Sequence, residues 1–360
     1  MTTQPIGVAV AGLGFGSSVH LPALEAAENL EAVALWHPRR ERLDQVCQTH
    51  GLRGFNDWDA LLRDSAVDAV IIATPPSPRF DLARRALEAG KHLLLEKPIA
   101  LHSDQALELQ RLAMAKGLSV AVDYEYRAVP LFMQAARMLA DGAIGVPWLV
   151  KLDWLMSSRS DPSRGWNWYS QVEQGGGVIG ALGTHAFDIL GWLIGPVGAV
   201  QALNSVSIKQ RPHPEGGMAA VDAEDVSFIQ TTLRWQGRPD VVVPAQISLS
   251  SVARNGRGCW LEVYGSEGNM VLGSGNQKDY VHGFELRHAS AGQQLRLVEP
   301  DADLAFPSTW SDGRIAPVSR LQSWWADSIR LARPMVPGLL EGIASRQACD
   351  QAMSSDQGFR

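Results

Sequence analysis

The first residues with a recognisable chemical use are three closely spaced glycines. Gly12, Gly14 and Gly16 stand between a short apolar run and a helix-like segment. Glycines at a strand-to-helix turn let the backbone approach a pyrophosphate, and the helix N-terminus adds free N–H groups and positive potential. The usual spacing is GxGxxG or GxGxxA, and the third position here is the small residue Ser17. The turn predicts a dinucleotide site, with a plain tight turn as the alternative.

The end of the second predicted strand, Glu31–Trp36, bears on the choice of dinucleotide. NAD-specific enzymes usually place an acid there, which binds the ribose 2′-hydroxyl. This chain has no carboxylate at that point, and Arg39 and Arg40 follow. Arginines suit a 2′-phosphate through paired, charge-assisted hydrogen bonds. The predicted cofactor is therefore NADP or NAD, with NADP favoured, and a solvated basic start to a helix is the alternative.

A lysine stands at a second position where chemistry is expected. Lys97 follows the predicted strand His92–Leu95 and precedes Pro98. Ligands of open α/β sheets bind at the carboxyl ends of the strands. Pro98 disfavours helical angles at the residue before it, so it holds Lys97 extended. The ammonium group of Lys97 could donate to a substrate oxygen. A surface lysine before a turn would look the same, and the residues alone leave both interpretations open.

A histidine farther along the chain is a candidate for proton transfer. His185 precedes Asp188 by three residues, so the two side chains can share one helix face. His185 is either a structural histidine bonded by its neighbour, a metal ligand, or a general base that takes a hydroxyl proton. Two ligands three residues apart are too few for a metal site, and we predict no bound metal. The structural and catalytic roles both stay open.

An aromatic-rich stretch lies just before a run of glycines. It includes Trp154, Trp166, Trp168 and Tyr169. Sugar rings and planar substrates stack on such side chains. A lid or a subunit contact packed by large side chains explains the same composition equally well.

The elements that position these residues differ between the two parts of the chain. Up to residue 123, apolar runs such as Ile6–Ala11 and Leu118–Val122 alternate with helix-like segments. Repeated βα units predict a doubly wound parallel sheet, the Rossmann arrangement, in an α/β fold. From residue 124 to 360, longer alternating runs such as Val226–Trp235 predict an α+β domain with a large, mostly antiparallel sheet that has one open face. We therefore expect two domains, 1–123 and 124–360.

Composition excludes several classes of protein. Of the 360 residues, 46% are hydrophobic and 19% are charged, as in a globular chain, and no apolar stretch is long enough to span a bilayer. The net charge of −6 provides no basic field for nucleic acid. The first residues lack the features of a secretion signal, and three scattered cysteines fit core thiols in a reducing compartment. We expect a cytoplasmic protein that binds a small-molecule substrate and neither nucleic acid nor membrane.

Several short motifs occur in a defined order from the start of the chain to about residue 272. They are Gly12-Leu13-Gly14-Phe15-Gly16, Ala73-Thr74-Pro75, Ala89-Gly90-Lys91-His92, Glu96-Lys97-Pro98, Tyr126-Arg127, Gly142 to Gly145, Gly175-Gly176-Gly177, Gly183-Thr184-His185 with Asp188, and Tyr264-Gly265-Ser266-Glu267-Gly268. This ordered set resembles the Gfo/Idh/MocA family, which includes glucose–fructose oxidoreductase and inositol dehydrogenase. The resemblance implies a Rossmann domain followed by a domain with an open sheet, often used for dimer or tetramer contacts.

The resemblance also implies which residues form the site. Lys97 and His185 would flank the nicotinamide, with Lys97 stabilising the substrate oxygen and His185 moving the proton. The expected cofactor-binding residues are Gly12, Gly14, Phe15, Gly16, Ser17, His37, Arg39, Arg40, Thr74, Pro75, Glu96, Lys97 and Arg127. The expected substrate-binding residues are Lys97, Tyr124, Trp166, Thr184, His185 and Asp188.

The chain departs from the family pattern at two places. Many members carry an aspartate four residues before this histidine, where this chain has Ala181. The segment Pro76–Arg79 also lacks the asparagine and histidine often found there. Either the substrate differs from the usual polyols, or another group such as Tyr124 makes the missing contact.

These observations predict an NAD(P)-dependent oxidoreductase that forms a homodimer or homotetramer through its C-terminal sheet. Hydride would pass between the nicotinamide and a hydroxyl- or carbonyl-bearing carbon of a sugar or cyclitol derivative. One alternative is a nucleotide-binding sensor or assembly protein without turnover, which the missing carboxylate at Ala181 favours and the retained Lys97 and His185 oppose. Another is a reductase of a non-sugar planar substrate, which the tryptophan-rich stretch favours.

Overall fold

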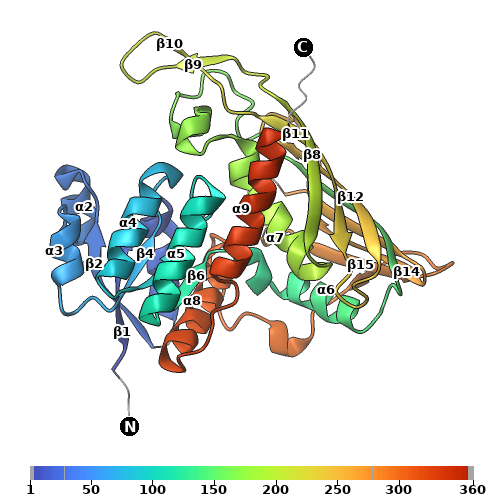
Figure 1. The fold of residues 1–360 in the computed structure, drawn as a ribbon, viewed down its shortest axis with the longest axis horizontal. Helices are drawn as coiled ribbons and strands as arrows, with labels where there is room; N and C mark the ends of the chain where they lie inside the picture. Colours follow the sequence, from blue (N-terminus) through green and yellow to red (C-terminus); the bar gives the residue numbers. More distant parts are fainter. Residues whose placement is uncertain (1–3, 28, 277–278, 280, 356–360) are drawn as a thin grey trace. The chain divides into compact units, whose positions relative to one another are not determined.

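The computed structural model describes residues 4–27, 29–276, 279 and 281–355 (Figure 1). The chain divides into two compact units. The first unit runs to Ala128 and takes in Ser308–Ile343, and the second comprises Val129–Pro307 and the chain from Ala344 onward. The segment 308–343 thus packs with the first unit, although it lies far beyond the expected boundary at residue 123. The functional assignment of the two domains stays a prediction.

The first unit is built on a six-stranded parallel sheet. Its strands are β1 (Ile6–Ala11), β2 (Leu30–Trp36), β3 (Arg53–Phe55), β4 (Ala69–Ile72), β5 (His92–Leu95) and β6 (Val120–Val122). Their order is β3-β2-β1-β4-β5-β6, and each neighbouring pair is parallel. Chain order reverses between β1 and β4, which is where ligands bind in open α/β sheets. The predicted Rossmann sheet is confirmed.

Helices cover both faces of this sheet because side chains alternate along each buried strand. Val8 of β1 belongs to one core and Ala9 to the other. Trp325, which is fully buried, packs in the core of Val8 together with Leu24. The helices of this unit are α1 (Leu21–Ala26), α2 (Arg40–His50), α3 (Trp58–Arg63), α4 (Pro76–Glu88), α5 (Ser103–Lys116) and α8 (Ile315–Arg330).

The second unit contains an eight-stranded sheet. Its strands are β7 (Pro147–Leu155), β8 (Val197–Ser205), β11 (Val226–Arg234), β12 (Val242–Ser250), β13 (Gly258–Gly265), β14 (Gly268–Ser274), β15 (Glu285–Ser290) and β16 (Arg296–Val298). Their order is β16-β15-β14-β13-β7-β12-β11-β8. β7 and β12 are parallel, and the other described pairs are antiparallel. The predicted, mostly antiparallel sheet is confirmed.

One face of this sheet is covered and the other is exposed. Buried and exposed residues alternate along β11, as expected for a strand with one face on a core. The remaining elements are α6 (Pro130–Ala140) and α7 (Thr184–Leu193), the hairpin of β9 (Gln210–Pro212) and β10 (Met218–Ala220), and α9 (Leu339–Ser354). In the described part of the chain, the helices are too short or too polar to cross a membrane.

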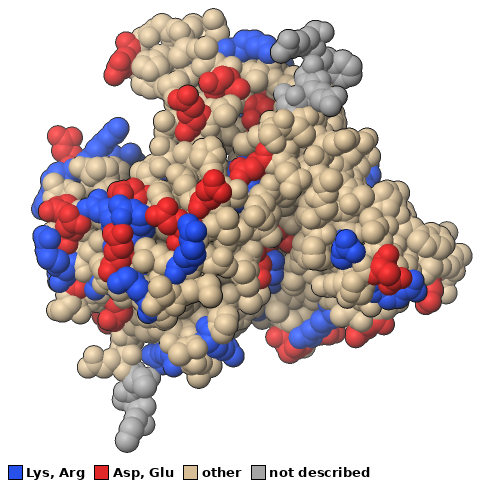
Figure 2. Space-filling view, in the orientation of Figure 1, with Lys and Arg blue, Asp and Glu red and all other residues tan. Residues whose placement is uncertain are grey.

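Charged side chains of both signs are interspersed over the first unit on the face drawn in Figure 2. On α4, Arg84 pairs with Asp81 at 3.0 Å and with Glu88 at 2.6 Å. Exposed pairs of this kind contribute little to stability, because water and salt screen the charges. Because neighbouring charges largely offset one another, this face does not offer the single-sign field that attracts a polyanion.

Candidate active site

The glycine turn after β1 has no room for a side chain at its first position. Gly12 has a φ of +103°, and a Cβ atom there would lie 2.6 Å from the carbonyl oxygen of Ala73. Gly14 is exposed, and a Cβ atom there would meet nothing within 4 Å. The bare backbone at Gly14 therefore faces open space ahead of the following helix. These residues fit a dinucleotide pyrophosphate, which needs close approach to main-chain N–H groups.

The residues after Gly14 fix the helix to the sheet. A Cβ atom at Gly16 would lie 3.0 Å from Cγ1 of Val10, so Gly16 makes the close helix–strand contact. Ser17 instead donates its hydroxyl to the carbonyl oxygen of Leu13 at 2.8 Å and so closes the loop on itself. Phe15 is half-buried, with its ring centroid 5.3 Å from that of His20.

Basic side chains follow the end of β2, and β2 does not end in an acidic residue. The ring Nδ1 of His37 accepts the main-chain N–H of Arg39 at 3.0 Å, which shapes this turn. Burial lowers the pKa of His37, and the nearby arginines add to the shift. Arg40 pairs with Asp44 at 2.8 Å, whereas the exposed Arg39 has no ion pair within the described residues. Arg39 is thus the better placed of the two predicted arginines to bind a phosphate.

A buried arginine joins the turn after β4 to the turn after β5. Arg79 donates to the carbonyl oxygens of Glu96 at 2.8 Å, Pro98 and Thr74. Burial lowers the pKa of its guanidinium to about 10, and nearby Glu96 opposes this shift. Arg79 lies in the segment Pro76–Arg79, which departs from the family pattern. Here it has a structural role, because it joins the Ala73-Thr74-Pro75 motif to the Glu96-Lys97-Pro98 motif. Within them, Thr74 is buried and Pro75 is exposed.

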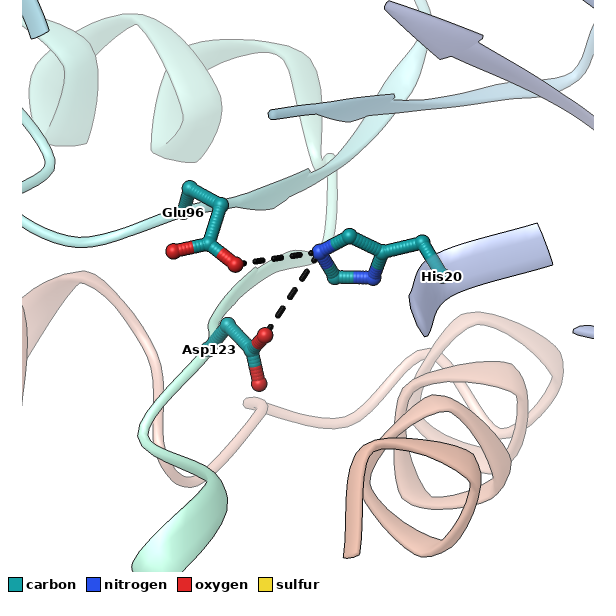
Figure 3. A group of neighbouring side chains, drawn as sticks. All are labelled: His20, Glu96 and Asp123. Atoms are coloured by element: carbon teal, nitrogen blue, oxygen red, sulfur yellow. Dashed lines mark hydrogen bonds and ion pairs between the residues drawn. The ribbon is translucent and has the colours of Figure 1, made fainter. Parts of the chain in front are cut away.

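Lys97 follows β5 at the carboxyl edge of the sheet, where it was predicted. It is half-buried and precedes Pro98 through a cis peptide bond. Its main-chain N–H donates to Oε2 of Glu96 at 3.2 Å. The other oxygen of this carboxylate, Oε1, lies 3.1 Å from Nε2 of His20 (Figure 3). The Glu96 carboxylate is therefore held from both sides.

Three buried acids share this edge and have very different proton affinities. Burial alone would raise the pKa of Glu96, but the His20 ring, Lys97 and Arg79 lower it to about 2. Burial, together with Glu96 and Glu125, raises the pKa of Asp123 well above its ordinary value. Burial also raises the pKa of Glu125 to about 7, although Lys97 opposes the shift. The edge therefore combines one firmly ionised carboxylate, Glu96, with two acids whose neutral forms are favoured by burial.

The segment after β6 brings three further side chains to the same unit. Tyr124, Glu125 and Arg127 are all buried, and the short helix η2 (Glu125–Ala128) begins there. β6 is the parallel neighbour of β5, so both strands end at one sheet edge. Tyr124 and Arg127 were predicted to contact ligands, and their place at this edge is compatible with that role.

The second unit positions His185 in the first turn of α7. A π-helical turn, η5 (Ile179–Gly183), leads into α7. His185 is buried, and its ring centroid lies 6.0 Å from that of Trp154 on β7. Asp188 is buried in the same helix, as its spacing predicts. Thr184 is also buried, and its hydroxyl is 3.0 Å from that of Ser345 on α9.

The aromatic stretch has a structural partner within the second unit. Trp166 donates its indole N–H to the carbonyl oxygen of Ala220 at 2.8 Å, and its ring centroid lies 5.1 Å from that of His213. These contacts fix Trp166 on the β9–β10 hairpin. Trp166 is thus held by the hairpin, and its predicted contact with substrate stays a prediction.

The glycine run before α7 allows a buried carboxylate to approach the backbone. A Cβ atom at Gly177, whose φ is +89°, would lie 2.3 Å from Oε1 of Glu224. This oxygen accepts the main-chain N–H of Ile179 at 2.8 Å, at the start of the helical segment that carries His185. Burial raises the pKa of Glu224 to about 7, and the Ile179 bond opposes the shift. Glu224 therefore anchors the helix of His185.

Four acidic or basic residues of these sites were not predicted: His20, Asp123, Glu125 and Glu224. The two acids that flank Tyr124 stand directly after a buried strand, which is a signal that the sequence does contain. His20 and Glu96 are 76 residues apart, and only the sheet topology brings them together. Within the described residues, His20, Glu96 and Asp123 offer three potential metal-ligand atoms within 4.8 Å of one another.

Two family models match the chain. Residues 6–124 match the model of the oxidoreductase family with an NAD-binding Rossmann fold, and residues 132–271 match the GFO/IDH/MocA C-terminal domain. An uncharacterized oxidoreductase of Synechocystis sp. is 42% identical over 361 residues, which cover 99% of this chain and 96% of that protein. The chain is thus an NAD(P)-dependent oxidoreductase with a Rossmann domain. It belongs to the Gfo/Idh/MocA family, as predicted.

More distant relatives include a dehydrogenase of known substrate. The levoglucosan dehydrogenase of Pseudarthrobacter phenanthrenivorans is 28% identical over 253 residues, 66% of this chain and 62% of that protein. A solved structure of levoglucosan dehydrogenase in complex with NADH and levoglucosan has a TM-score of 0.85 at 23% identity, covering 98% of this chain and 97% of that one. At this identity the structural likeness shows the shared fold.

The protonation of Glu224 predicts a pH-dependent stability. Its pKa is about 7 in the folded chain against an ordinary 4.5, so the neutral acid stabilises the fold fully below pH 4.5 and this contribution is lost as pH rises through 7. Glu224→Gln keeps an acceptor for Ile179 but cannot ionise. As pH rises from 4.5 to 7, we expect the free energy of unfolding of the variant to increase by about 3 kcal/mol relative to that of the parent. Urea unfolding across this range measures the difference.

The control for this prediction is Glu215→Gln, since Glu215 is exposed. It should change the free energy of unfolding equally at every pH in the range. Parallel pH profiles for Glu224→Gln and the parent protein would contradict the role given to Glu224.

Proposed function

We propose that this oxidoreductase transfers hydride between the nicotinamide and a carbon that bears a hydroxyl or carbonyl group on a sugar or cyclitol derivative. The observation that carries the proposal is the place of Lys97. It lies at the carboxyl edge of the sheet, and its neighbour Glu96 is bonded to His20 of the turn that follows the glycine loop. The sugar dehydrogenases among the relatives support a substrate of this class.

The protein's own contribution would be placement and charge, while the nicotinamide supplies the hydride chemistry. Gly12, Gly14 and Gly16 would hold the pyrophosphate. Lys97 would donate a hydrogen bond to the substrate oxygen and stabilise negative charge as it develops there. His185 would accept the hydroxyl proton when the substrate is oxidised.

Removal of the Lys97 ammonium tests this proposal. Candidate sugars and cyclitols, with aromatic diols for comparison, are first screened by the absorbance of reduced nicotinamide. With a substrate found, Lys97→Ala should lower kcat by about 10²-fold or more, because one donor at a developing oxyanion is lost. Dinucleotide affinity, measured by tryptophan fluorescence, should change by less than about threefold.

A matched control is Lys116→Ala, which removes an exposed lysine from the end of α5. It should leave kcat unchanged. Normal turnover by Lys97→Ala would refute the catalytic assignment of Lys97. A protein that binds dinucleotide but turns over none of the candidates would instead favour the nucleotide-binding sensor.

We also propose NADP as the preferred cofactor, with Arg39 as its selecting residue. Arg39→Ala should weaken NADP(H) binding by about tenfold or more, because a charge-assisted bond to the 2′-phosphate is lost. NAD(H) binding should change little, and the control Arg111→Ala on α5 should affect neither cofactor. Fluorescence titrations with both dinucleotides measure these affinities. A parent protein that prefers NAD(H) would overturn the proposal.

For the partner, we propose self-association through the exposed face of the eight-stranded sheet. Four large apolar side chains are exposed on neighbouring strands: Leu149, Phe228, Val242 and Tyr264. Leu149 and Tyr264 are directly opposed on β7 and β13, and contiguous exposed apolar side chains are typical of protein interfaces. Phe228→Glu should lower the mass measured by light scattering, whereas Met114→Glu on α5 should not. A monomeric parent, or an unchanged mass for Phe228→Glu, would contradict this.

A further inference from the structure

A buried histidine joins the glycine loop to the ends of two strands. His20 closes η1 (Gly16–His20), which begins directly after the glycine loop. Its Nε2 lies 3.1 Å from Oε1 of Glu96, after β5, and 3.5 Å from Oδ2 of Asp123, after β6 (Figure 3). His20 is fully buried, and both acids are at most 8% exposed. The cluster is therefore shielded from bulk water.

The position of the ring proton follows from Gln322 of α8. The amide nitrogen of Gln322 lies 3.3 Å from Nδ1 of His20 and 3.3 Å from the carbonyl oxygen of the same residue. A carbonyl oxygen only accepts, so the amide NH₂ group must face it. The same NH₂ group then donates to Nδ1. Nε2 therefore carries the ring proton and donates it to Oε1 of Glu96, while Oδ2 of Asp123 lies farther away, at 3.5 Å.

Asp123 must then be the acid that keeps its proton. Both of its carboxyl oxygens are buried, and within the described residues neither receives a hydrogen bond from a donor. An ionised carboxylate in that place would be left uncompensated, at a large desolvation cost. A neutral Asp123 can turn its proton toward Glu96, since the two carboxyl groups have oxygens within 4.8 Å of each other, and burial beside Glu96 raises the pKa of Asp123 in the same sense. Two carboxyl groups in contact commonly share one proton in this way.

The hydrogen bonds of Glu96 also fix the main chain of Lys97. Oε1 of Glu96 is held by His20, and Oε2 accepts the main-chain N–H of Lys97 at 3.2 Å. Arg79 fixes the carbonyl oxygen of Glu96 at 2.8 Å. With both carboxylate oxygens and the main chain bonded, the backbone at Lys97 has one defined position relative to η1.

We propose that His20, Asp123 and Gln322 are positioning residues that orient the Glu96 carboxylate and thereby set the place of the Lys97 ammonium relative to the glycine loop. The proposal rests on the catalytic role proposed for Lys97. It assigns the cluster to a proton-holding network rather than a metal site. A cation on Nε2 would require the ring proton on Nδ1, where it would face the NH₂ group of Gln322 at 3.3 Å.

Two substitutions at Asp123 test whether its proton is needed to orient Glu96. Asp123→Asn keeps a neutral donor beside Glu96, whereas Asp123→Leu removes it at similar size. We expect Asp123→Leu to lower kcat by about tenfold or more, with the KM for dinucleotide within about threefold. Asp123→Asn should keep kcat within about threefold of the parent. Gln322→Met, which frees Nδ1 of His20, should resemble Asp123→Leu. If Asp123 had a merely structural role, its two variants would not differ in kcat in this way.

Infrared spectroscopy tests the proton without relying on turnover. The spectrum of the parent protein at neutral pH should contain a carboxylic acid C=O band that is absent from Asp123→Asn. If the band is present but no substrate is turned over, the proposed function fails and the network stands. An unchanged spectrum would overturn the proposal, as would equal loss of kcat in both Asp123 variants. Stoichiometric metal in the parent that is lost from Asp123→Asn would also overturn it.

Discussion

The carboxylate of Glu96 imposes the strongest physical constraint in the first unit. An ionised carboxylate remains inside a protein only when donors surround it. Here the His20 ring and the main chain of Lys97 each donate a hydrogen bond, and the neutral acid Asp123 is proposed to supply a third. Each donor belongs to a different element that ends at one edge of the sheet. The need to satisfy one charge therefore ties the glycine loop, β5 and β6 into a single rigid edge.

The second unit also contains a buried acid that bonds to the main chain, but this acid is largely neutral. Glu224 is buried against the backbone of the glycine run, and its carboxyl oxygen accepts the N–H of Ile179. Its pKa of about 7 leaves much of it neutral at neutral pH. In both units a buried acid thus holds the segment that carries a proposed catalytic residue, Lys97 in one case and His185 in the other. In the Gly175-Gly176-Gly177 motif, this close approach explains Gly177, whereas a Cβ atom at Gly176 would meet the carbonyl oxygen of Tyr169.

Sequence patterns predicted the parts of the fold that depend on local periodicity. β5 was predicted with its observed bounds, and the turn at Gly12 was predicted because strand, glycines and helix are adjacent. β3 and α3 were missed because both are short. The three residues of β3, for example, give no usable alternation. The bond between His20 and Glu96 was missed for a different reason. It depends on which strands are neighbours in the sheet, and no local pattern contains that information. Arg79 was noted as a departure from the family pattern, but its three carbonyl partners are apparent only in the folded chain.

The place of α8 has a consequence for how the protein is made. Trp325 completes a core whose other members, such as Val8 and Leu24, are near the start of the chain. All six strands of the first sheet have left the ribosome long before α8 is synthesised, because the whole eight-stranded sheet is translated in between. At ordinary elongation rates this interval is on the order of ten seconds. During that time this face of the nascent first sheet is covered only in part, by α1 and α2, and exposed apolar surface is the kind of surface that chaperones bind.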